Sequence, residues 1–121
     1  MMLSALIVIR NEEEQLPACL NTLAFADEIV VVLDRSTDGS REIAEAARAK
    51  IVEGAWEIEG DRRNSGIAAC SGDWVLEIDA DERVTPELAR EIVATLPGAA
   101  PGYFGIKFNN YVGSRLVTYG W

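Results

Sequence analysis

Asp79 and Asp81 come directly after the largely apolar run 74–78, which the sequence predicts as a buried strand. Ligands of open α/β sheets bind at the carboxyl ends of the strands. Two carboxylates one residue apart can converge at a strand-to-loop bend, and such hard oxygen ligands suit Mg²⁺ or Mn²⁺. A metal held there would bridge a diphosphate and neutralise the charge that develops as a nucleoside diphosphate leaves. The alternative is that residues 79–82 form a solvated acidic loop before the next helix.

A second acidic position, Asp34, follows the β-branched run 28–33. This places Asp34 at the carboxyl end of another predicted strand, where its side chain could accept a hydrogen bond from a pyrimidine ring N–H. Asp38, four residues later, precedes a predicted helix. Carboxylates are favoured at helix N-termini, so a capping role is the preferred interpretation of Asp38.

The first predicted strand also ends on polar residues, Arg10, Asn11 and Glu12. Backbone groups in this segment could contact the base of a nucleotide. Glu12 or Glu13 could equally serve as a helix-start residue. The sequence leaves both interpretations open.

Two adjacent arginines, Arg62 and Arg63, precede the fourth predicted strand. The rigid fork of a guanidinium group matches a diphosphate, and Asn64 would belong to the same patch. The alternative is a surface ion pair with Glu59 or Asp61. Trp56 and Trp74, in contrast, are predicted to pack in the core rather than to stack on a ligand.

The overall charge limits the classes of partner. The 121 residues include 20 acidic and 11 basic side chains, which gives a net charge of −9. This balance disfavours a nucleic-acid interface and broad adhesion to anionic lipid. No stretch reaches the roughly 18 consecutive apolar residues of a membrane span, and the N-terminus does not resemble a signal peptide.

Residue types that are rare or missing exclude further chemistries. The sequence has no histidine, which removes Ser-His and Cys-His nucleophiles and makes a typical zinc site improbable. Cys19 and Cys70 are predicted to be reduced core thiols in a cytoplasmic protein. No glycine-rich phosphate loop of the ATPase or dinucleotide type is present, so metal and arginine must handle any phosphate.

Short β-branched runs alternate with amphipathic segments, which predicts one α/β domain over residues 1–121 with a mainly parallel sheet flanked by helices. The predicted strands are residues 3–9, 28–33, 50–53, 74–78 and 103–108. The predicted helices are residues 12–23, 40–48, 61–70 and 86–96, the last with Thr85 as N-cap and Pro86 at its first position. Residues 109–121 show no clear period.

In combination, these segments are similar to the family 2 glycosyltransferases of GT-A fold. The order that carries the resemblance is Arg10-Asn11-Glu12, Asp34 to Gly39, Arg63 to Gly66, Ser71 to Trp74, and Asp79 to Glu82. The segments 26–29, 72–74 and 79–87, with the tail 110–113 and 120–121, most resemble the bacterial lipopolysaccharide-core β-glycosyltransferase subgroup. The match spans essentially all of the chain.

The resemblance implies a Rossmann-like GT-A domain that binds a nucleotide-diphospho-sugar, most simply a UDP-sugar, and inverts the anomeric carbon with Mg²⁺ or Mn²⁺. It also implies a glycan or lipid-linked acceptor. The implied localisation is cytoplasmic, with peripheral attachment to the inner membrane face as an alternative. The implied metal ligands are Asp79 and Asp81. The implied donor-binding residues are Arg10, Asn11, Glu12, Asp34, Arg62, Arg63, Asp79, Ala80 and Asp81.

Three features depart from the family pattern. Many relatives carry an acidic residue where this chain has Leu33 and a glycine where it has Arg35. The family's catalytic base comes from a second half of the fold, and no residue here matches that motif. We therefore expect the donor-binding part of a longer fold, with its aromatic tail (Tyr111, Tyr119 and Trp121) as an oligomer contact. The alternative is a non-catalytic nucleotide-binding or interaction module. This chain lacks the arrangement of aspartate and lysine that a signalling receiver domain needs. It also lacks the glycine-rich loop after the first strand that is typical of a nucleotidyltransferase.

Overall fold

The computed structural model describes residues 2–99 with their side chains and the backbone of 103–107 and 114–119. These residues form a six-stranded sheet of order β3-β2-β1-β4-β6-β5. The strands are β1 (Leu3–Ile9), β2 (Glu28–Asp34), β3 (Lys50–Gly54), β4 (Trp74–Glu77), β5 (Tyr103–Lys107) and β6 (Ser114–Tyr119). The helices are α1 (Leu16–Asn21), α2 (Ser40–Ala46), α3 (Glu59–Ala69), α4 (Pro86–Thr95) and the short 3₁₀ turn η1 (Leu96–Gly98).

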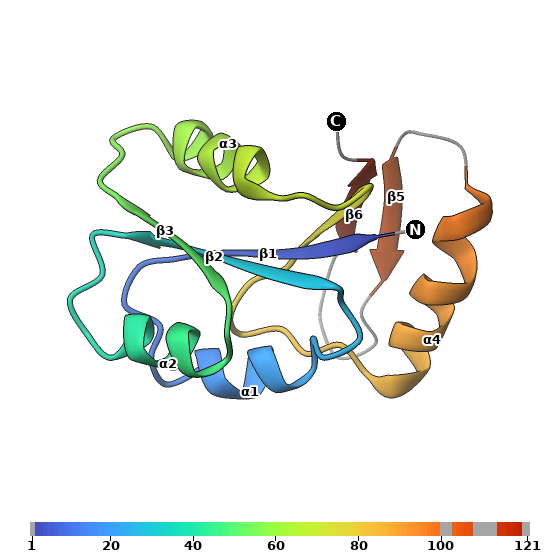
Figure 1. Cartoon of the computed structure of the whole chain (residues 1–121), viewed down its shortest axis with the longest axis horizontal. Helices are drawn as coiled ribbons and strands as arrows, with labels where there is room; N and C mark the ends of the chain where they lie inside the picture. The colour runs from blue at the N-terminus through green and yellow to red at the C-terminus, as the bar shows by residue number, and fades with distance from the viewer. Residues whose placement is uncertain (1, 100–102, 108–113, 120–121) are drawn as a thin grey trace.

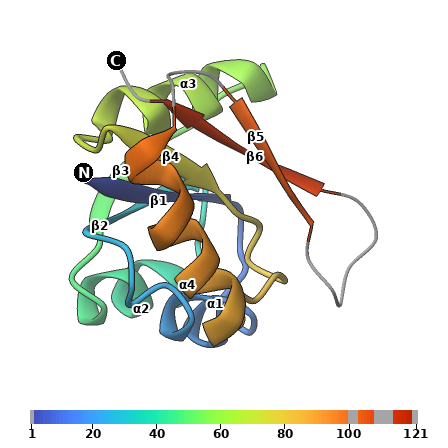
Figure 2. The same cartoon turned by 90° about the vertical axis from the view of Figure 1, so that its right-hand side faces the viewer.

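The first four strands run parallel, with β1 at the centre of this group between β2 and β4. α3 covers one face of the sheet, and α1, α2 and α4 lie on the other (Figures 1 and 2). This three-layer arrangement confirms the predicted α/β fold with a mainly parallel sheet flanked by helices. Among the described residues, none of the helices is long and apolar enough to cross a membrane.

The alternation of side chains along β1 divides the core into two clusters. Leu3, Ala5, Ile7 and Ile9 face the layer of α1, α2 and α4, where they join a large buried cluster. Leu6 faces α3 and joins a smaller cluster with buried valines of β2 and β4. Both faces of the central strand are therefore covered, as its nearly continuous apolar sequence predicts.

The connections of the parallel strands place a crevice between β1 and β4. The β1-to-β2 connection passes through α1, whereas the β3-to-β4 connection passes through α3 on the opposite face (Figure 1). The strand order therefore reverses between β1 and β4. In open α/β sheets this switch point opens a crevice at the carboxyl ends of the two strands, and ligands bind there.

α3 approaches the sheet closely at Gly66. A Cβ atom on this residue would lie 2.6 Å from Leu6 Cδ1 and 2.7 Å from Val32 Cγ2, closer than real Cβ atoms come to their neighbours. The hydrogen of glycine thus lets the helix rest on β1 and β2. This contact fixes the position of α3, whose N-terminal half carries Arg62 and Arg63.

Two predicted helices are shorter than expected. The first begins at Leu16 rather than at residue 12, because Pro17 has no N–H to donate to the preceding turn. The second ends at Ala46 rather than at residue 48, because Arg48 adopts a left-handed conformation with φ of 59°. The third predicted helix begins two residues early, at Glu59, and ends at Ala69.

Residues 109–121 show no clear period in the sequence, yet they contain β6. This strand pairs antiparallel with β4 on one side and with β5 on the other. Its pairing partners lie elsewhere in the chain, so its own sequence carries little of the signal. Tyr111, Trp121 and the side chain of Tyr119 lie outside the described residues, and the oligomer contact expected there stays a prediction.

Candidate functional site

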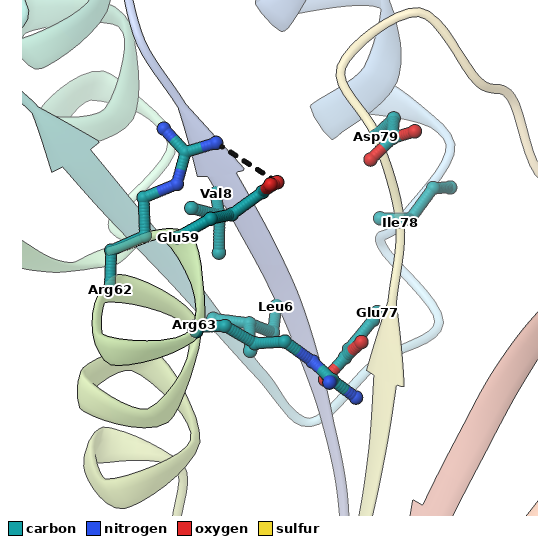
Figure 3. Close-up of a pocket in the computed structure, with 9 residues that line it drawn as sticks. Leu6, Val8, Glu59, Arg62, Arg63, Glu77, Ile78 and Asp79 are labelled. Atoms are coloured by element: carbon teal, nitrogen blue, oxygen red, sulfur yellow. Dashed lines mark hydrogen bonds and ion pairs between the residues drawn. The ribbon is translucent and has the colours of Figure 1, made fainter. Parts of the chain in front are cut away.

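Two hollows of about 410 and 460 Å³ open at the carboxyl ends of β1 and β4. They share Val8, Arg62 and Asp79, so they are adjoining parts of one crevice. The first is further lined by Leu6, Glu59, Gly60, Arg63, Glu77 and Ile78, and most of these are drawn in Figure 3. The second is further lined by Ile9, Arg10, Glu12, Gln15, Ala80 and Asp81. The crevice therefore gathers most of the predicted site residues.

The turn after β4 brings three carboxylates together. Asp79, Asp81 and Glu82 each offer an oxygen atom, and these atoms all lie within 4.8 Å of one another. Asp79 and Asp81 are exposed, whereas Glu82 is buried. The predicted convergence of the two aspartates is thus present in the structure. A cluster of hard oxygen donors that faces a crevice fits a divalent cation of the Mg²⁺ or Mn²⁺ type.

Glu82 holds the backbone of this turn. Its Oε1 accepts a hydrogen bond of 2.8 Å from the Asp79 N–H, and its own N–H donates to the Asp79 carbonyl at 3.0 Å. This role of Glu82 was not predicted from the sequence. The only signal in the sequence for this role is the position of Glu82 three residues after Asp79, which is the spacing of a turn.

Groups beneath the turn complete its support. Arg83 donates to the Ala80 carbonyl at 2.7 Å and to Gln15 Oε1 at 2.7 Å, which ties the turn to the segment before α1. The buried Cys19 thiol lies 3.6 Å from the Asp79 carbonyl. Burial raises the pKa of Cys19 to about 12, so this thiol remains a protonated donor at neutral pH.

Asp34 is buried, and both of its oxygens accept hydrogen bonds from the protein. Oδ1 accepts from Arg35 Nε at 2.9 Å and from the Trp56 N–H at 3.3 Å. Oδ2 accepts from Arg35 Nη2 at 3.2 Å and from Arg62 Nη1 at 3.0 Å. The hydrogen bond from Arg35, aided by the others, lowers the pKa of Asp34 despite its burial. None of these hydrogen-bond partners of Asp34 was predicted from the sequence.

The two arginines of α3 make different ion pairs. Arg62 Nη2 lies 3.3 Å from Glu59 Oε1, which is one of the surface pairs considered from the sequence. Arg63 Nε lies 2.7 Å from Glu77 Oε1, across the first hollow from α3 to β4 (Figure 3). Asn64 is exposed on α3 and is not among the residues that line the two hollows.

The segment after β1 serves partly to join loops. Arg10 and Glu12 are exposed and line the second hollow. Asn11 has a left-handed φ of 53°, and its Oδ1 accepts from the Thr37 N–H at 2.7 Å and the Asp38 N–H at 3.2 Å. Asn11 thus connects the loops that follow β1 and β2, a structural role that the sequence analysis did not consider.

Asp38 lies at the start of α2, as predicted. Its Oδ1 accepts from the Ser40 N–H at 3.0 Å and its Oδ2 from the Glu13 N–H at 3.1 Å, although the N-cap residue itself is Gly39. The predicted packing roles of the two tryptophans are also confirmed. Trp74 is buried, and Trp56 packs against the cluster beneath α3.

Fold and crevice together define a doubly wound α/β domain with a cluster of carboxylates at its switch point. The model of Glycosyl transferase family 2 matches residues 4–111, and the chain belongs to this family. The chain is 37% identical over 91 residues to an uncharacterized glycosyltransferase of Rickettsia bellii, a match that covers 74% of this chain and 31% of the relative. It therefore spans about a third of the length of this relative.

Two further comparisons agree with the family. The lipopolysaccharide core biosynthesis glycosyltransferase LpsC of Rhizobium meliloti is 31% identical over 112 residues, which cover 85% of this chain and 40% of that protein. The crystal structure of Staphylococcus aureus TarS 1–349 in complex with UDP-GlcNAc superposes with a TM-score of 0.74 at 27% identity, over 90% of this chain and 35% of the other. The structural similarity to TarS confirms the predicted GT-A glycosyltransferase fold.

Proposed function

We propose that this chain is the donor-binding part of an inverting glycosyltransferase and that it binds a nucleotide-diphospho-sugar through a divalent cation. The observation that carries the proposal is the convergence of Asp79, Asp81 and Glu82 at the switch-point crevice. An acidic surface repels a diphosphate, and a cation held by these carboxylates removes that repulsion.

Asp79 and Asp81 would hold the cation, with Glu82 close behind them. The cation supplies neutralisation of the charge on a departing nucleoside diphosphate. Arg62 and Arg63 lie on α3 and line the crevice opposite Asp79 (Figure 3), and we propose that a diphosphate would exchange with their carboxylate partners Glu59 and Glu77. Arg10, Asn11, Glu12 and Ala80 border the same space or its supporting loop and complete the proposed donor site.

A UDP-sugar is the donor that we favour. TarS, whose structure was solved with UDP-GlcNAc, shares 27% of its aligned residues with this chain and belongs to the same fold. Its ligand supports a uridine nucleotide as the first one to test. The similarity to LpsC supports a glycan or lipopolysaccharide-type acceptor. The two free cysteines fit the reducing cytoplasm, including its inner membrane face.

We assign donor binding to this chain and sugar transfer to the whole protein. Inversion needs a base on the acceptor side in line with the leaving group, and we propose no residue of this chain for that role. The second candidate is a nucleotide-binding module without transferase activity, because we assign no residue of this chain to the base. An assay for sugar transfer to an added acceptor separates the two candidates.

Calorimetric titration with UDP tests the binding proposal. We expect heat of binding in the presence of Mn²⁺ or Mg²⁺ and its loss when the cation is removed by a chelator. Binding of equal strength with and without the chelator would contradict the metal-dependent site.

A further inference from the structure

Arg62 is held by two carboxylates of very different exposure. Its Nη1 lies 3.0 Å from Asp34 Oδ2, and the Asp34 side chain is 2% exposed. Its Nη2 lies 3.3 Å from Glu59 Oε1, and the Glu59 side chain is 84% exposed. An exposed pair one helical turn apart contributes little, whereas breaking a buried pair leaves an uncompensated charge. Arg62 therefore has one fixed partner and one exchangeable partner.

Asp34 is itself fixed from several directions. Arg35 donates two hydrogen bonds to its carboxylate and a third, at 3.0 Å, to the Trp56 carbonyl. The Trp56 N–H donates back to Asp34. The carboxylate is thus enclosed by protein donors, and a nucleotide base would have to displace one of them to reach it.

Arg62 is the residue of this network that retains an unused hydrogen-bond donor. Its Nε is buried and has no hydrogen-bond acceptor among the residues that the structure describes. Together with Val8 and Asp79, Arg62 lines both hollows and so stands where they meet. Figure 3 shows its guanidinium group on the α3 side of the crevice, with Asp79 on the β4 side. A buried guanidinium N–H that lacks an acceptor favours an anionic ligand whose oxygens can accept a hydrogen bond there.

We propose that Asp34 is a positioning residue that fixes Arg62 at the junction of the two hollows, and that the diphosphate of the donor displaces Glu59 from this arginine. The inference rests on the proposed function and changes the predicted role of Asp34. Asp34 acts through Arg62 on the phosphates.

The two carboxylate partners of Arg62 should therefore respond in opposite directions. In titrations with UDP and Mn²⁺, Asp34→Asn should weaken binding about tenfold or more, because Arg62 loses its fixed partner. Glu59→Gln should strengthen binding about two- to fivefold, because it removes a weak competitor for the arginine. Asp34→Asn in an Arg62→Ala background should change the affinity by less than about twofold, since its effect passes through the missing side chain.

Glu28→Gln is the matched control. Glu28 begins β2 and Asp34 ends it, and the Glu28 carboxylate likewise joins distant segments by accepting from Ser4 and Ser71. This variant should lose stability without a change in UDP affinity. NMR spectroscopy provides a readout without ligand, because the Arg62 Nε–H should give a slowly exchanging signal in the wild type and in Glu28→Gln. The signal should be lost in Asp34→Asn.

Additive losses from Asp34→Asn and Arg62→Ala would overturn the inference, because they would show that Asp34 acts independently of the arginine. Weaker UDP binding by Glu59→Gln would overturn the proposal that the diphosphate displaces Glu59 from Arg62. A wild-type protein that fails to bind UDP with Mn²⁺ would instead refute the proposed function itself. The two failures are therefore distinguishable.

Discussion

Glu82 lies beneath the two exposed aspartates and shapes the turn that presents them. Only 4% of its surface is exposed, and its Oε1 accepts from the Asp79 N–H at 2.8 Å. Replacement by alanine leaves this N–H without its acceptor. We expect Glu82→Ala to lower the free energy of unfolding by about 1–3 kcal/mol and to weaken Mn²⁺-dependent UDP binding. Urea denaturation and calorimetry measure the two effects.

Glu91→Ala serves as the control for Glu82→Ala. Glu91 is exposed on α4, so the same change in charge and size should alter stability by less than about 0.5 kcal/mol. Equal effects of the two variants on UDP binding would refute a role of Glu82 in supporting the turn.

The carboxylate of Glu28 should make stability depend on acidic pH. Burial raises its pKa, but hydrogen bonds from Ser4 and Ser71 outweigh burial and lower it overall. The unfolded chain then binds more protons than the folded chain as the pH falls through this range, so acid destabilises the fold. Between about pH 5 and pH 3, the wild type should lose more stability than Glu28→Gln in urea denaturation. Parallel losses in the two proteins would exclude this contribution.

At the residue scale, the sequence predicts where a polar residue lies in the sheet better than it predicts the hydrogen-bond partners of that residue. Polar residues directly after buried strands, such as Asp34 and Asp79, do lie at the carboxyl edge of the sheet. Two of the hydrogen-bond donors to Asp34, Trp56 and Arg62, lie more than 20 positions from it in the chain. Such pairs depend on how the loops pack, which no local pattern encodes.

At the scale of elements, α3 positions Arg62 and Arg63, and Gly66 allows this helix to pack closely against the sheet. Gly66→Ala places a Cβ 2.6 Å from Leu6 Cδ1 in a packed cluster, which costs about 1–3 kcal/mol. The better helix propensity of alanine returns up to about 1 kcal/mol. We expect a net loss of unfolding free energy, together with weaker UDP binding because α3 moves outward. Chemical denaturation and calorimetry test both expectations.

Gly60→Ala is the control on the same helix. A Cβ on Gly60 meets nothing within 4 Å, so this substitution should leave stability unchanged or raise it by up to about 1 kcal/mol. A Gly66→Ala protein as stable as Gly60→Ala would contradict the close packing of α3 against β1 and β2.

Elements with strong local signals are predicted well. The four parallel strands match their expected bounds to within one residue, because each contains a short apolar run bounded by polar or turn residues. α1 is misjudged because the polar segment 12–15 continues the helical pattern while Pro17 interrupts the hydrogen bonds. β6 is missed because its strand character depends on pairing with β4 and β5.

At the scale of the whole molecule, the reversal of strand order assembles the site. β1 and β4 are neighbours in the sheet although about 70 positions separate them in the chain, and their carboxyl ends bring Arg10 and Asp79 to one crevice. The net charge of −9 makes a cation the simplest means of accepting a diphosphate there. The proposed metal-dependent binding of the donor therefore depends most on the carboxylates that would hold the cation.

The most direct test is to compare UDP titrations of Asp81→Ala and Asp73→Ala in Mn²⁺. Asp81 follows β4 and belongs to the carboxylate cluster, whereas Asp73 precedes the same strand and is exposed at its opposite end. The account predicts that Asp81→Ala weakens binding about a hundredfold or more and that Asp73→Ala binds as the wild type does. UDP binding by Asp81→Ala at wild-type strength would contradict it.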